Sequence, residues 1–340
     1  MRRLSLSIAA AVTAVALATA AAPATTIAPD LRTVLSKDLK FAPFELADLE
    51  RGRIVKHGLD AAAPGEIAVV GATRVNARKE AFVDRVRNIE EFKRGPDVVQ
   101  IGRFSDPPKL EDLASLTIGR EDVDLRRCRV GSCDIRLPAD VIARVPREID
   151  WKAPNADARA AALFKQVLFE NVRAYVSGGP GRIVEYDDEK RPVRPLDDFA
   201  GLLNNSPYLG TLVPGLPGHL QRFSDPLAGA EDFLYWSKEK FGLTPFITVT
   251  HVTITRTASG AYVIASRDVY SSRYFDASLS LTIASDAVGP TAFYLVYANR
   301  SRAYALKGPL AGLRRSIIER RAKGSVEENL RTMKLRLERQ

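Results

Sequence analysis

His251 is the residue of this chain whose type and surroundings best suit acid–base chemistry. It lies within Ile247–Ile254, an apolar and β-branched segment that is typical of a strand. Asp268 and Asp276 follow on neighbouring predicted strands, where either carboxylate could orient the imidazole of a general base. A histidine inside an apolar strand is more often a hydrogen-bonded core residue, so we favour a structural role for His251 and assign no catalytic residue.

The two cysteines of the chain, Cys128 and Cys133, are separated by Arg-Val-Gly-Ser. In an oxidising compartment, this short spacing around a central glycine predicts a local disulfide that closes a turn. A metal site would need further ligands, and His57, His219 and His251 are far apart in the sequence. We therefore predict a disulfide, with no metal and no cofactor.

The N-terminus predicts export. Arg2 and Arg3 precede an apolar segment, Leu4–Leu17, and Ala18-Thr19-Ala20 has the small residues of a cleavage site. The apolar segment is shorter than the roughly 20 residues that a membrane-spanning helix needs. We therefore predict a cleavable signal peptide over residues 1–20 and a periplasmic or secreted mature protein.

The chain is basic, with 50 Lys and Arg against 41 Asp and Glu, a formal net charge of +9 in 340 residues. This excess makes an anionic membrane surface a candidate partner. The basic residues are scattered along the chain, and the predicted export separates the protein from nucleic acid, so we expect no nucleic-acid partner.

Strand-like segments in the last third of the chain must position these side chains. They are Phe233–Phe241, Pro245–Thr257, Ala261–Ser271, Arg273–Ser285 and Thr291–Arg300. Apolar and polar residues alternate from Tyr274 to Ile283, which predicts a sheet with one apolar face. The apolar phase changes between Val249 and Val252, which predicts a bulge near His251.

The segment Pro309–Gln340 is predicted to form a basic amphipathic helix, with Leu313 and Ile317 at the start of its apolar stripe. Lys323-Gly324 predicts a break. Ser325–Glu328 has the pattern of a capping box that restarts the helix.

The first two thirds of the chain contain shorter predicted elements. Residues 21–64 read as an Ala/Pro-rich tether followed by short helices. A strand at Gly65–Val75, a helix at Arg78–Lys93 and a strand at Val98–Phe104 open the main domain, residues 65–340. An irregular helical insertion covers about residues 139–230.

This order of strand, helix, strand, late meander and C-terminal helix resembles the START-type helix-grip superfamily. The resemblance implies an α+β fold in which a curved antiparallel sheet wraps on the long C-terminal helix, here with an inserted helical subdomain. It also implies an apolar ligand held between the sheet and the helix.

We therefore expect an exported, non-catalytic binding protein for an apolar or amphipathic, lipid-like small molecule. Residues expected to contact the ligand are Val249, His251, Tyr270, Tyr274, Tyr294, Tyr297, Leu313 and Ile317. Two other interpretations stay open: a hydrolase or cyclase on the same scaffold that uses His251, and an envelope structural or interaction protein whose sheet interior is filled.

Overall fold

The computed structural model describes residues 26–178, 185–223, 226–240, 244–288, 291–303, 306 and 311–339. The predicted signal peptide lies outside these residues. Among the helices that are described, none combines the length and hydropathy needed to cross a bilayer.

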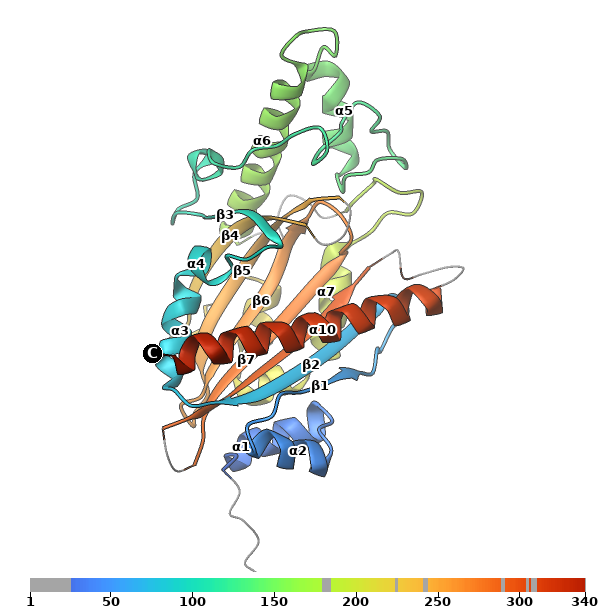
Figure 1. Cartoon of the computed structure of the whole chain (residues 1–340). Helices are drawn as coiled ribbons and strands as arrows, with labels where there is room; N and C mark the ends of the chain where they lie inside the picture. Colours follow the sequence, from blue (N-terminus) through green and yellow to red (C-terminus); the bar gives the residue numbers. More distant parts are fainter. Residues whose placement is uncertain are drawn as a thin grey trace, which may run out of the picture.

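The centre of the molecule is one antiparallel sheet of eight strands in the order β1-β2-β8-β7-β6-β5-β4-β3 (Figure 1). The strands are β1 (Val55–Leu59), β2 (Glu66–Val75), β3 (Val98–Arg103), β4 (Glu231–Glu239), β5 (Phe246–Arg256), β6 (Tyr262–Ser271), β7 (Ala277–Asp286) and β8 (Phe293–Arg302). All five predicted late strands are present, and β2 joins them by pairing along the whole of β8.

Helices lie on both faces of this sheet and above one end of it (Figure 1). They are α1 (Pro29–Thr33), a π-helical turn (Val34–Asp38), α2 (Pro43–Glu50), α3 (Lys79–Arg87), α4 (Ile89–Phe92), a 3₁₀ turn (Leu110–Leu113), α5 (Ala139–Glu148), α6 (Ala156–Val176), α7 (Pro195–Asn204), α8 (Tyr208–Leu212), α9 (Leu216–Gln221) and α10 (Ala311–Glu338). The predicted fold class is confirmed: an α+β protein with a curved antiparallel sheet, a long C-terminal helix and helices inserted between β3 and β4.

Helix α10 runs without interruption, so the predicted break at Lys323-Gly324 is wrong. A glycine inside a helix costs about 1 kcal/mol relative to alanine. Packing overrides that preference here, because Val326 and Leu330 are buried against the sheet on the far side of Gly324.

The two faces of the sheet pack against different helices. The face that contacts α3, α4 and α10 is called the α10 face, and its apolar residues include Val69, Val252 and Leu295. The opposite face, called the α7 face, packs against α1, α2 and α7–α9. Because side chains alternate along a strand, each strand at the centre of the sheet contributes side chains to both faces.

Helices α5 and α6 form a subdomain above the end of the sheet where β4 and β5 meet (Figure 1). Its apolar core includes Leu168 and Val172 of α6 and extends to Trp236 and Val249 on the sheet. The predicted disulfide is confirmed: Cys128 and Cys133 are bonded at the edge of this subdomain. A disulfide is consistent with a periplasmic or extracellular location.

Candidate functional site

The α10 face carries a group of partly buried polar side chains on β6, β7 and β8, here called the polar surface. Its members are Ser266, Asp268, Ser278, Ser280, Thr282, Tyr297 and Asn299. Their neighbours that point to the α7 face, such as Ala265, Leu281 and Ala298, are at most 3% exposed. One face of the same three strands is therefore closed by helices, while the other is open and polar.

The polar surface is open because α10 lies to one side of it. The helix packs along β2 and β1, where Val326 and Leu330 press against the backbone at Gly71. On the same face, α4 packs against β3, and α3 contacts β7. In Figure 1 the upper parts of β5, β6 and β7 are seen directly, with no described helix in front of them.

Side chains of the polar surface are ordered by hydrogen bonds to one another. The Asn299 amide donates to Ser280 Oγ (2.9 Å), and the hydroxyls of Ser280 and Tyr297 lie 3.2 Å apart. Ser301 Oγ donates to Asn299 Oδ1 (2.8 Å), which fixes the orientation of the amide. A hydroxyl can donate once and accept twice, so these groups keep capacity for a ligand.

Asp268 is the titratable member of the polar surface. Burial raises the pKa of its carboxyl to about 7, although the Thr250 hydroxyl donates to it (3.0 Å) and Lys93 stabilises its charge. Lys93 itself is held by Glu239 (2.6 Å) and by the Tyr235 hydroxyl (3.3 Å). Near neutral pH, Asp268 can therefore either donate or accept a hydrogen bond to a bound molecule.

A groove of about 430 Å³ lies between α3–α4 and the last turns of α10. Ala81, Phe92 and Met333 supply its apolar part, and these three also pack against the core of the α10 face. Polar and charged residues also line it: Arg78, Asp84, Arg85, Asn88, Glu91 and Arg336. Small-molecule sites occupy about 300–1,000 Å³, so this groove is large enough for one.

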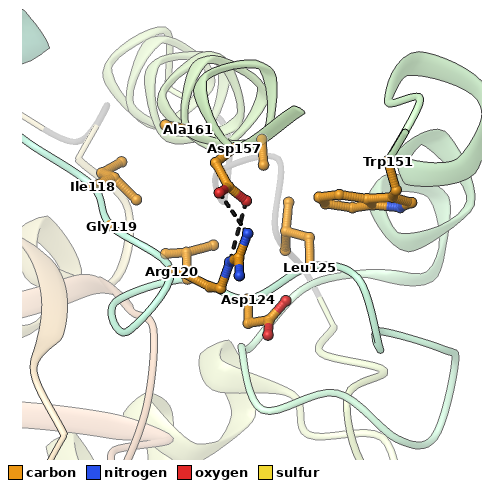
Figure 2. A pocket seen from close by; sticks show the side chains of 10 residues that line it. Ile118, Gly119, Arg120, Asp124, Leu125, Trp151, Asp157 and Ala161 are labelled. Carbon is orange, nitrogen blue, oxygen red and sulfur yellow. Dashed lines mark hydrogen bonds and ion pairs between the residues drawn. The ribbon is translucent and has the colours of Figure 1, made fainter. Parts of the chain in front are cut away.

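A second pocket lies between residues 118–125 and α6 (Figure 2). Arg120 reaches across it to Asp157 and forms an ion pair of 2.7 Å. Its volume is about 10 Å³, roughly the room of one water molecule. This pocket is therefore no ligand site.

The structure does not bring the predicted ligand-binding residues together. Tyr297 belongs to the polar surface, but Val249, His251, Tyr270 and Tyr294 are buried on the opposite face. Tyr274 lies in the turn between β6 and β7, and its hydroxyl donates to the Thr244 carbonyl (3.1 Å). Leu313 and Ile317 are 62% and 48% exposed on α10.

The two carboxylates predicted to orient His251 do not contact it. Asp268 points to the other face of the sheet, and Asp276 forms a buried ion pair with Arg136 (2.6 Å). The partner of His251 is Asp232 on β4, which the sequence analysis missed. Asp232 stands near the start of a predicted strand, and only the pairing of β4 with β5 places it beside the histidine.

Asp232 Oδ1 is the centre of a buried cluster on the α7 face. It accepts hydrogen bonds from the Nε2 atoms of His251 (2.9 Å) and His219 (3.0 Å), and from the Thr253 hydroxyl (2.7 Å). Burial works to raise the pKa of Asp232, but these hydrogen bonds outweigh it and hold the pKa well below its ordinary value. Burial lowers the pKa of His251.

The chain matches no family model, and no curated protein matches it. The antiparallel sheet with its long C-terminal helix is compatible with a helix-grip arrangement. What the protein does must therefore be argued from its own structure.

Proposed function

We propose that the protein is an exported binding protein that holds a small amphipathic molecule on the α10 face of the sheet without transforming it. The contrast between the two faces carries this proposal. Strands β6–β8 are closed by apolar packing on the α7 face and carry partly buried hydroxyl, amide and carboxyl groups on the other.

The binding region combines polar and apolar parts. Phe92 lines the groove beside α10, and the next residue, Lys93, lies close enough to Asp268 to influence its charge. An apolar portion of a ligand would gain about 25 cal/mol for each Å² that it buries against Phe92 and Met333. Its polar groups would bond to Tyr297, Asp268 and their neighbours.

The ligand would lie beside α10 rather than beneath it. The sequence predicts a molecule between the sheet and the C-terminal helix, but Val326 and Leu330 fill the space over β2. The exposed polar surface and the groove between α3–α4 and α10 supply the remaining room on that face.

Catalysis by His251 is not favoured, because its side chain is fully buried and is engaged at both ring nitrogens, by Tyr175 and Asp232. A substrate would have no direct access to the ring.

Two matched tyrosines on β8 test the proposal. Tyr297→Phe removes a hydroxyl from the polar surface, and Tyr294→Phe removes one from the opposite face of the same strand. The protein would be purified without detergent, and bound molecules would be extracted into organic solvent and identified by mass spectrometry. A panel of fatty acids, sterols and aromatic acids would then be screened by thermal shift.

We expect a co-purifying amphipathic molecule, or a panel member that raises the melting temperature. Loss of one hydrogen bond corresponds to about 1 kcal/mol, so Tyr297→Phe should weaken binding about fivefold, while Tyr294→Phe leaves it unchanged. An empty protein that no panel member stabilises would overturn the proposal, as would equal effects of the two substitutions.

A further inference from the structure

Two of the three histidines of the chain converge on one carboxylate oxygen. His219 comes from α9 and His251 from β5, and each directs its Nε2 atom at Asp232 Oδ1, at 3.0 and 2.9 Å. The potential ligand atoms of the three residues all lie within 4.8 Å of one another. The fold thus brings together His219 and His251, which are far apart in the sequence.

This spacing fits a shared metal ion. Zn²⁺ binds imidazole nitrogen at about 2.0–2.1 Å and carboxylate oxygen at about 2.0–2.2 Å, so ligand atoms around it stand roughly 3–4 Å apart. The separations in the cluster are within an ångström of these values. Two histidines and one carboxylate are also a donor set that suits divalent transition metals.

The surroundings of the cluster orient and shield the rings. The Tyr175 hydroxyl lies 2.9 Å from His251 Nδ1, the second contact that metal-binding histidines usually make. The Phe223 ring packs 4.6 Å from the His251 ring and 5.7 Å from the His219 ring. The side chain of Asp232 is 20% exposed, which leaves one side from which an ion can enter.

Arg267 is the nearby cation, and its charge acts on His251. Its guanidinium donates to the carbonyls of Leu220 (2.7 Å) and Gln221 (3.1 Å) and lies over the Phe199 ring. These contacts hold one terminal nitrogen of the arginine, Nη1, to the chain that follows His219 rather than to Asp232.

We propose that His219, Asp232 and His251 bind one divalent transition-metal ion, for which Zn²⁺ is the reference. The ion would join α9 to strands β4 and β5. Three protein ligands leave a further coordination position for water or for the Thr253 hydroxyl, which lies beside Asp232 Oδ1. This site is on the opposite face from the proposed ligand surface and does not depend on it.

Only one histidine of the chain, His57, lies outside the proposed site, so it can serve as the control. The full exported chain, purified without a histidine tag and stripped with a chelator, would be titrated with Zn²⁺ by calorimetry and with Co²⁺ by visible absorption. His219→Ala and Asp232→Asn remove ligands, and Tyr175→Phe removes only the hydroxyl beside His251. His57→Ala is the control, because that imidazole bonds to Glu45 and to the Leu39 carbonyl elsewhere.

We expect one equivalent of Zn²⁺ and a Co²⁺ spectrum with imidazole ligands. Binding should be lost on removal of a ligand, weakened about 10-fold or more by Tyr175→Phe, and unchanged by His57→Ala. Circular dichroism would show whether each variant folds. If His219→Ala fails to fold, Asp232→Asn still tests the site, because it keeps the volume of the side chain. Absence of stoichiometric binding by the unmodified protein, or binding that survives Asp232→Asn or depends on His57, would overturn the proposal.

Discussion

Gly71 of β2 lies directly beneath Val326 of α10. A Cβ atom on the glycine would stand 2.5 Å from Val326 Cγ1 and 2.9 Å from Leu330 Cδ1, so the helix rests on the bare strand backbone. This close approach fixes α10 over β2 at the side of the sheet. The polar surface on β6–β8 is uncovered as a consequence.

Gly71→Ala should destabilise the protein. The added methyl group would overpack the contact between α10 and β2, at a cost of about 1–3 kcal/mol in the free energy of unfolding. Urea denaturation measures this change. Gly58→Ala on β1 is the control, because the nearest atom to its Cβ would be the Ala68 carbonyl oxygen at 3.8 Å. Alanine there should be neutral or stabilising by about 0.5–1 kcal/mol, and equal losses at both sites would contradict the packing argument.

Glu66→Gln should lower the free energy of unfolding far more than the loss of a surface charge does. Glu66 is fully buried on the α7 face, where its carboxylate bonds to Arg300 (2.7 Å) and to the Asn205 amide (2.9 Å). Neutralising it leaves the buried Arg300 charge uncompensated, which costs about 3–5 kcal/mol. The loss would be measured as the free energy of unfolding in urea.

The matched substitution is Glu231→Gln, which breaks an exposed pair with Arg87 of similar length (2.7 Å). Exposed pairs contribute about 0–1 kcal/mol, so this variant should unfold close to the wild type. If the two variants lost similar stability, the burial of Glu66 would not be what makes its charge important.

Local patterns in the sequence were sufficient to predict strands β2 to β8, but not β1, which lies within the residues predicted as a tether and short helices. The alternation in β7 places Leu279, Leu281 and Ile283 in the apolar core and Ser280 on the opposite face, as a period of two requires. The disulfide was also predictable, because Cys128 and Cys133 are so close in the sequence that the pairing needs no tertiary information.

The predicted bulge near His251 is present, but it does not cause the change of apolar phase in β5. Strand β5 alternates without a break, and its register against β6 shifts between Val249 and Thr250, where Val269 is the extra residue of β6. After Val249, the α7 face of β5 carries His251 and Thr253 instead of apolar residues. The pattern therefore marked a polar cluster as well as a nearby bulge.

The candidate sites themselves could not be predicted, because they depend on contacts between distant segments. Asp232 lies beside His251 only because β4 pairs with β5, and His219 belongs to α9, a short helix of the insertion. Likewise, the openness of the polar surface depends on where α10 packs. Nothing in the amphipathic pattern of α10 says that it lies over β2.

Asp268 should make the stability of the protein depend on pH. Its pKa is raised to about 7 in the folded state, mainly by burial, against about 3.9 in an unfolded chain. Below pH 4 the carboxyl is protonated in both states. Between about pH 4 and 7 the unfolded chain releases the proton while the folded protein retains it, so the contribution of Asp268 to stability falls as pH rises. Above pH 7 the penalty is constant.

Asp268→Asn removes this titration while keeping an oxygen that can accept from the Thr250 hydroxyl. The variant should gain about 1–3 kcal/mol relative to the wild type between pH 5 and pH 8, measured by urea denaturation at each pH. Lys93 and Glu239 also act on Asp268, and they are present in both proteins, so the difference isolates the carboxyl. Asp97→Asn, at an exposed position, is the control for the loss of one carboxyl group. A pH-independent difference in stability between Asp268→Asn and the wild type would mean that the carboxyl ionises in the folded protein as it does in the unfolded chain. Asp268 would then supply no proton donor to the polar surface near neutral pH.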